Sequence, residues 1–170
     1  MSAEMSEDRR VHKTAPDYFH DRLGWESVFA YNEETLGAKG TLGRTSQREV
    51  YLVRYLREAL EKLNPNLPQP AYDTALRLIT ETRYERNDIR INREKYLLFR
   101  NGVPVTFRND KGEIEKKRLK VFDFETPDNN RFLVVRELWI EKIPYRKRPD
   151  ILGFVNGIPL VFIELKNVHK

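Results

Sequence analysis

The pattern of apolar positions changes along the chain, from a helical spacing to the alternation and short runs typical of strands. Between Val53 and Leu63 apolar residues recur at the three-four spacing of one helical face, which predicts a helix over residues 47–63. Two further helical segments are predicted over residues 71–82 and 88–99. The part of the chain before them, residues 16–45, predicts short strands and loops.

Strand patterns dominate the second half of the chain. Strands are predicted over residues 103–107, 119–122, 132–143, 151–155 and 160–165. The last two are nearly continuous apolar runs, as expected of strands buried on both faces. Helices first and a sheet at the C-terminal end predict an α+β (α/β-like) fold with a central mixed sheet flanked by helices.

Composition narrows the class of protein. The chain of 170 residues carries a net charge of +5 with 34% charged residues, which favours a polyanionic partner such as nucleic acid. The absence of cysteine excludes disulfides, thiolate metal sites and cysteine nucleophiles. No apolar run reaches the roughly 18 residues of a membrane span. We therefore expect a cytoplasmic protein without a membrane partner, with a flexible N-terminus over residues 1–15 and one domain over residues 16–170.

The most informative chemistry lies in the last two predicted strands. Asp150 directly precedes one strand, and Glu164 and Lys166 lie at the end of the next. Two carboxylates in an apolar sheet are costly to bury unless a cation compensates them, and their hard oxygens suit Mg²⁺ or Mn²⁺. Such a group can hold a metal against a phosphate, with the ammonium of Lys166 orienting an attacking water or offsetting charge.

Whether this site exists depends on the register of the hairpin. A flat two-residue turn at Asn156-Gly157 would pair Asp150 with Ile163, so that Asp150 and Glu164 would lie on opposite faces and the metal site would be excluded. A three-residue loop with Gly157 in the left-handed conformation shifts the register by one and places both carboxylates on one face. We predict this bulged turn. Without the shift, Glu164 and Lys166 are ordinary charges on the polar face of an edge strand.

These residues resemble the PD-(D/E)xK nuclease motif. More specifically, residues 148–167 are similar to the N-terminal nuclease domain of the restriction (HsdR) subunit of type I restriction-modification enzymes. Two upstream stretches agree with that family, the one running from Asn92-Arg93-Glu94 to Val105 and the one from Phe122-Asp123-Phe124 to Val135. The resemblance covers about residues 45–167 and implies a restriction-endonuclease-like core.

The resemblance implies Mg²⁺-dependent cleavage of double-stranded DNA, which makes the protein a type I site-specific deoxyribonuclease. It assigns Asp150, Glu164 and Lys166 as the catalytic residues, with Asp150, Glu164 and the backbone carbonyl of Leu165 as metal ligands. In the family, cleavage is coupled to ATP-driven translocation within a complex that contains modification and specificity subunits. Neither a phosphate-binding loop for ATP nor the family's downstream glutamine-tyrosine motif occurs here, so we expect a C-terminally truncated N-terminal fragment of a larger motor subunit.

Several candidates have more than one interpretation. Glu49 is either an additional metal ligand, as the superfamily implies, or the second half of a capping box with Ser46. Arg146, Lys147 and Arg148 either bind DNA phosphates beside the cut site or form a solvated turn. For the whole chain, the alternatives are a non-catalytic docking or DNA-binding domain of the same complex and a stand-alone nuclease such as a junction resolvase.

Overall fold

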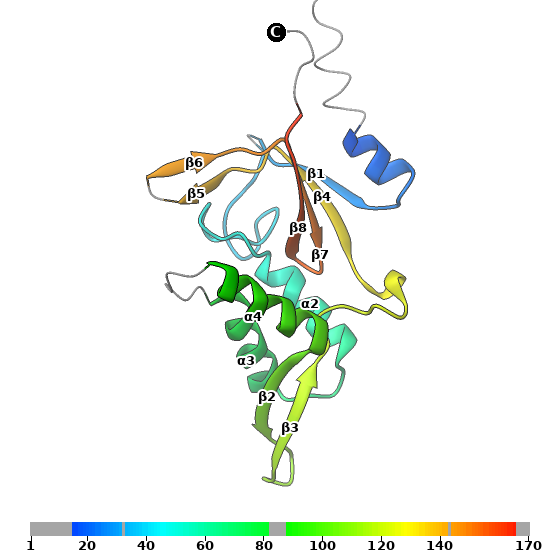
Figure 1. Cartoon of the computed structure of the whole chain (residues 1–170), viewed down its shortest axis with the longest axis vertical. Helices are drawn as coiled ribbons and strands as arrows, with labels where there is room; N and C mark the ends of the chain where they lie inside the picture. The colour runs from blue at the N-terminus through cyan, green and yellow to red at the C-terminus, as the bar shows by residue number, and fades with distance from the viewer. Residues whose placement is uncertain (1–14, 32, 82–87, 143, 166–170) are drawn as a thin grey trace, which may run out of the picture. The chain divides into compact units, whose positions relative to one another are not determined.

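The computed structural model describes residues 15–31, 33–81, 88–142 and 144–165. They belong to two compact units, one formed by Met1–Leu52 with Arg131–Lys170 and the other by Val53–Asn130 (Figure 1). Helices combined with a mixed sheet confirm the predicted α+β class. No helix in the described part of the chain is both long and apolar enough to cross a membrane. The predicted flexible N-terminus lies outside the described residues except at Ala15.

The first unit contains a short helix over residues 15–21 and a four-stranded sheet. The strands lie in the order β1 (Glu26–Phe29), β4 (Phe132–Arg136), β7 (Ile151–Val155) and β8 (Ile158–Ile163). The pair β1 and β4 is parallel and the other pairs are antiparallel, so the sheet is mixed as predicted. The central strands β4 and β7 carry most of the buried residues of this sheet, as continuous apolar runs predict.

The single long strand predicted over residues 132–143 is wrong, because the chain bends at Glu137. Glu137 has a φ of 53°, in the left-handed region that ends an extended strand. The chain then leaves the sheet as a separate antiparallel hairpin of β5 (Ile140–Lys142) and β6 (Tyr145–Lys147). Apolar composition alone does not reveal this bend, since both segments are rich in strand-forming residues.

The prediction that the last strand is buried on both faces is also wrong. β8 is an edge strand, and Leu160 and Phe162 on it are 53% and 60% exposed. Its neighbour β7 is buried along Ile151–Phe154 as predicted. An apolar run therefore does not show whether a strand is central or at the edge of the sheet, because β7 and β8 have nearly the same composition.

The sheet packs closely around Gly153 at the centre of β7. A Cβ atom at this position would lie 2.8 Å from Cβ of Val161 and 3.0 Å from Cζ3 of Trp25. Trp25 itself packs against Phe19 and Phe132, with ring centroids 4.9 and 5.1 Å away. Glycine at this point therefore lets the indole and the neighbouring strand approach the backbone.

We expect Gly153→Ala to destabilise the first unit by about 1–3 kcal/mol, because the added methyl group forces the sheet or Trp25 to shift. Urea denaturation followed by tryptophan fluorescence measures this, since both tryptophans lie in this unit. The double variant Gly153→Ala with Trp25→Leu should lose less stability than the sum of the losses of the two single variants, because the smaller side chain leaves room for the methyl group. An unchanged stability of Gly153→Ala would contradict the close packing.

The second unit is helical at its start and ends in a hairpin. Its elements are α2 (Val53–Leu63), α3 (Gln69–Thr80), α4 (Asp88–Asn101), β2 (Val103–Arg108), β3 (Ile114–Leu119) and a 3-10 turn over Pro127–Asn129. Its core contains Leu60 of α2, Ile79 of α3 and Val105 of β2, all buried. The three predicted helices and the strand predicted over residues 103–107 are confirmed with shifted boundaries, whereas the strand predicted over residues 119–122 is wrong because β3 ends at Leu119.

The start of the first predicted helix is wrong. α2 begins at Val53, so Ser46 is not its N-cap. The segment before it is bound in a loop, where the N–H of Leu52 donates to the carbonyl of Gly157 (2.8 Å) and the carbonyl of Glu49 accepts from Arg44 (3.0 Å). Tertiary hydrogen bonds thus hold these residues in a conformation that local helix signals do not reveal.

Candidate active site at the ends of β7 and β8

The hairpin that joins β7 and β8 has a two-residue turn. Val155 pairs with Ile158, and both turn residues have left-handed φ values, 51° for Asn156 and 79° for Gly157. Such angles suit an Asn-Gly type I′ turn. Asn156 also exchanges hydrogen bonds with Arg131, since its N–H donates to the Arg131 carbonyl and its Oδ1 accepts from the Arg131 N–H, both at 2.8 Å. The predicted three-residue turn is therefore wrong.

The register shift that the site requires is nevertheless present, further along β8. Phe154 pairs with Pro159 and Gly153 pairs with Val161, so Leu160 is an extra residue that bulges out of the ladder. Beyond the bulge Ile151 lies opposite Ile163. Asp150 and Glu164 are the next residues on the two chains, and continuing the register by one residue would place them opposite each other.

One hydrogen bond shows that the two chains stay side by side beyond the ladder. The backbone N–H of Leu165 donates to Oδ2 of Asp150 at 2.7 Å. On the other side of β7, the N–H of Glu137 donates to the backbone carbonyl of Asp150 at 2.9 Å. Asp150 is partly buried and Glu164 is exposed. Asp150 is thus fixed at both its backbone and its carboxylate, while Glu164 directly follows β8 at the open edge.

The donor set fits a hard cation that keeps most of its water. Asp150, Glu164 and the carbonyl of Leu165 offer oxygen ligands only, and Mg²⁺ sites commonly use one or two carboxylates together with substrate oxygens. Among the described residues, no three His, Cys, Asp or Glu side chains gather closely enough to hold a metal ion. Glu49 therefore does not join Asp150 and Glu164 in one cluster. Its carboxylate instead accepts hydrogen bonds from the backbone N–H (3.1 Å) and the hydroxyl of Thr45.

Lys166, the third predicted catalytic residue, lies outside the described residues. The basic residues before Asp150 are described, and all three are exposed. The guanidinium carbon of Arg146 lies 3.9 Å from the ring centre of Trp139, and Arg148 forms an ion pair with Glu137 at 3.3 Å. The predicted solvated turn is therefore a strand and its flank, with two of the three cations held by neighbouring side chains.

A buried ion pair in the first unit is not indicated by the sequence. Arg44 is fully buried and binds both carboxylate oxygens of Glu34, at 2.8 and 2.6 Å. It also donates to the carbonyls of Glu49 and Trp139, both at 3.0 Å. Charged residues in a polar loop usually stay exposed, so nothing in the local pattern points to this pair. Through it, the loop over residues 33–49 is joined to the backbone where the β5–β6 hairpin begins.

The Asp123 stretch that resembles the family serves as a turn in the second unit. Oδ1 of Asp123 accepts from the N–H groups of Glu125 and Thr126, at 3.1 and 3.0 Å, and Oδ2 accepts from the side chain of Asn129 at 2.8 Å. These hydrogen bonds, that of Asn129 first, lower the pKa of the Asp123 carboxyl. The geometry assigns a structural role to this aspartate, in contrast to Asp150.

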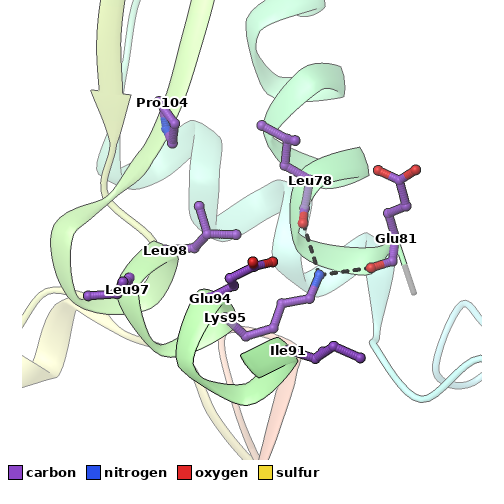
Figure 2. A pocket seen from close by; sticks show the side chains of 8 residues that line it. All are labelled: Leu78, Glu81, Ile91, Glu94, Lys95, Leu97, Leu98 and Pro104. Atoms are coloured by element: carbon purple, nitrogen blue, oxygen red, sulfur yellow. Dashed lines mark hydrogen bonds between the residues drawn. The ribbon is translucent and has the colours of Figure 1, made fainter. Parts of the chain in front are cut away.

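The second unit contains a pocket of about 270 Å³ between α3, α4 and the start of β2 (Figure 2). Lys95 reaches across it and donates to the carbonyls of Leu78 and Glu81, both at 2.9 Å. A lysine that binds the last carbonyls of a helix stabilises its C-terminal end, and α3 ends at this point. None of the predicted site residues lines the pocket, so it contributes nothing to the candidate active site.

The fold and the site together define a class: an α+β chain with a mixed sheet, compatible with a nuclease-like N-terminal domain, in which Asp150 and Glu164 follow the last residue pair of two adjacent strands. Comparison with protein families is more specific. Residues 4–170 match the model of the type I restriction enzyme R protein N terminus, and the chain belongs to this family.

Two relatives are informative. The type I restriction enzyme HindI endonuclease subunit of Haemophilus influenzae is 40% identical over 146 residues, which cover 85% of this chain and 14% of the relative. A provisionally named type I restriction enzyme, the MjaIXP endonuclease subunit of Methanocaldococcus jannaschii, is 30% identical over 129 residues, or 73% of this chain and 12% of the relative. The chain thus spans a small part of the length of these subunits, and it corresponds to the N-terminal domain of an endonuclease subunit.

Proposed function

We propose that this chain is the Mg²⁺-dependent endonuclease domain of a type I restriction enzyme and hydrolyses phosphodiester bonds of double-stranded DNA. The observation that carries the proposal is the register of β7 and β8 beyond the bulge, in which Ile151 pairs with Ile163 and Asp150 and Glu164 are the next residues on the two chains. Family membership supports it, because the relatives are named as endonuclease subunits. A bulge that brings two carboxylates together at a strand end is a common device for directing side chains into an active site.

The proposed roles follow from position and chemistry. Asp150 and Glu164 would hold the metal ion with the carbonyl of Leu165, and the hydrogen bond from the Leu165 N–H (2.7 Å) keeps the Asp150 carboxylate in one orientation. Lys166 would orient the attacking water and offset negative charge on the phosphate. Bound Mg²⁺, or Mn²⁺ in its place, supplies Lewis acidity that neutralises charge developing on the phosphate oxygens. Glu49, whose carboxylate is bonded to Thr45, is the least supported ligand of the set.

The wider context is also proposed. Because the chain spans 14% and 12% of its relatives, we infer that it is the N-terminal part of a larger subunit. ATP would act only through motor segments outside this chain. Modification and specificity subunits would be its protein partners, double-stranded DNA its substrate, and the cytoplasm its place of action.

The test is DNA cleavage by the full-length subunit assembled with its modification and specificity subunits. We expect Asp150→Asn and Glu164→Gln each to lower the cleavage rate by about 10²-fold or more, because each removes a charge that acts on the transition state. Chelation of divalent cations should abolish cleavage, and Mg²⁺ or Mn²⁺ should restore it. Asp110→Asn, which changes an exposed turn of the second unit, is the matched control and should cut normally.

The outcomes separate the alternatives. Cleavage that survives both substitutions in the candidate site would assign the chain a docking or DNA-binding role without catalysis. Metal-dependent cleavage by the isolated chain without ATP would instead indicate a stand-alone nuclease.

A further inference from the structure

Rings and guanidinium groups alternate along one side of the first unit, next to the candidate active site. The guanidinium carbon of Arg146 lies 3.9 Å from the ring centre of Trp139. That of Arg148 lies 5.2 Å from the Trp139 ring and 4.3 Å from the Tyr31 ring. These distances lie within the range of favourable cation–π contact. Trp139 therefore contacts two arginines at once, and Arg148 contacts two rings.

The strand geometry assigns these side chains to one face of the β5–β6 hairpin. Glu141 pairs with Arg146 and Ile140 pairs with Lys147, so Trp139 and Arg148 form the next opposite pair. Opposite residues and alternate residues share a face, which groups Trp139 and Glu141 with Arg146 and Arg148. The same alternation places Tyr145 and Lys147 on the other face. The hairpin thus divides the three consecutive basic residues into a stacked pair and a single lysine.

Each member of the stacked pair is held by more than its ring contact. Nε of Arg146 donates to Oε1 of Gln47 at 3.0 Å, and Arg148 pairs with Glu137 at 3.3 Å. The carbonyl of Trp139 accepts from the buried Arg44 at 3.0 Å, which fixes the backbone beneath the indole. A guanidinium carries five N–H groups. These contacts therefore orient each arginine and use only some of its N–H donors. The two cations are thus preorganised at an exposed position.

We propose that Trp139, Arg146 and Arg148 form a phosphate-binding face for the backbone of duplex DNA, with Trp139 and Tyr31 as the residues that position the two guanidinium groups. The inference rests on the proposed function, which supplies DNA as the substrate. Of the four basic residues over 140–148, Arg146 and Arg148 lie on this face, and the carboxylate of Glu141 on the same face is paired with Arg48 at 3.8 Å. Guanidinium forks match phosphate geometry, and ordering them in advance lowers the entropic cost of binding.

The position of this face relates it to the cut site. Arg148 is two residues before Asp150, and its partner Glu137 also binds the Asp150 carbonyl through its backbone N–H. A phosphate bound by Arg148 would therefore contact the short segment between β6 and β7 that also carries the candidate metal ligand Asp150. The face would hold the backbone near the scissile phosphate without reading sequence, since phosphate contacts position a protein and carry no base information.

Affinity for a short labelled DNA duplex, measured by fluorescence anisotropy on the 170-residue chain in the presence of a chelator, tests the proposal. We expect Trp139→Ala to weaken binding by roughly 5- to 10-fold although it changes no charge, because both arginines lose their orientation. Trp139→Phe should keep most of the affinity, since a smaller ring still offers a stacking face. Arg146→Lys should also weaken binding, because lysine keeps the charge but lacks the fork.

Two matched controls lie on the opposite face of the same strand. Lys147→Gln removes the same charge as Arg146→Gln, and Tyr145→Ala removes an exposed ring. We expect Arg146→Gln to reduce the slope of log affinity against log salt concentration by an amount that corresponds to the loss of about one phosphate contact. Lys147→Gln and Tyr145→Ala should leave both affinity and salt dependence close to wild type. Equal effects of Arg146→Gln and Lys147→Gln, or unchanged binding by both Trp139→Ala and Arg146→Lys, would overturn the proposal.

DNA binding without metal tests the phosphate-binding face, and DNA cleavage with metal tests the nuclease assignment, so the two proposals can fail independently. If Asp150→Asn abolishes cleavage in the assembled enzyme while Trp139→Ala and Arg146→Lys bind DNA normally, the phosphate-binding face is wrong and the nuclease assignment stands. If these two variants lose affinity while Asp150→Asn cuts normally, the face stands and the catalytic assignment is wrong.

Discussion

Insertion of one alanine between Ile163 and Glu164 is expected to reduce Mg²⁺-dependent DNA cleavage to background. The ladder between β7 and β8 ends at the pair Ile151 and Ile163, so the insertion leaves all observed pairs intact. It places the new alanine opposite Asp150 and moves Glu164 to the other face, because side chains alternate along an extended chain. The site would lose one of its two carboxylates, and Lys166 would be displaced by one residue relative to Asp150.

Deletion of Leu160 is the matched control and is expected to preserve cleavage. Leu160 is the extra residue of the bulge, and its side chain is 53% exposed. Without it, Phe154 still pairs with Pro159 and Gly153 with Val161, now in a regular ladder. Asp150 therefore stays opposite Glu164. The two variants change the length of the same strand by one residue, yet only the insertion separates the carboxylates.

Cleavage is measured in the assembled enzyme, and circular dichroism checks that both variants keep the sheet. Normal cutting by a folded insertion variant would show that Glu164 does not act together with Asp150. Loss of cutting by a folded variant without Leu160 would show that the bulge itself, and not the register beyond it, shapes the site.

The register shift between the last two strands was predicted correctly, but it was placed at the wrong point of the hairpin. Asn156-Gly157 is a strong signal for a two-residue turn, and the need for an extra residue placed the bulge at that turn. In the structure the turn is regular, and Leu160 on the exposed edge strand takes up the extra residue. A bulge on an edge strand leaves little trace in the sequence, because an apolar residue there differs little from its neighbours.

The other differences share a cause. Glu137 ends β4 in a left-handed conformation, and residues 46–52 form a loop where local signals predict a helix. Both segments are held by hydrogen bonds to residues far along the chain, such as those from the Glu137 N–H to Asp150 and from the Leu52 N–H to Gly157. Element types and the α+β class follow from local periodicity, whereas such long-range bonds do not.

Disruption of the buried ion pair between Arg44 and Glu34 is expected to lower the stability of the first unit more than disruption of an exposed ion pair. The two side chains are 0% and 6% exposed, and the guanidinium binds both carboxylate oxygens. We expect Glu34→Gln to lower the free energy of unfolding by about 3 kcal/mol or more, because it leaves the buried Arg44 charge uncompensated. Urea denaturation followed by tryptophan fluorescence reports this unit, which contains Trp25 and Trp139.

A second bidentate ion pair in the same unit provides the matched control. Arg131 binds both carboxylate oxygens of Glu26 at 2.7 and 2.9 Å, but these side chains are 39% and 51% exposed. Because water screens that pair, Glu26→Gln should cost less than about 1 kcal/mol. The double variant Arg44→Met with Glu34→Leu should recover much of the loss, since apolar side chains of similar volume leave no unpaired charge. Equal losses from Glu34→Gln and Glu26→Gln would show that burial of the Arg44 pair contributes nothing specific, and that the loop is held by other contacts.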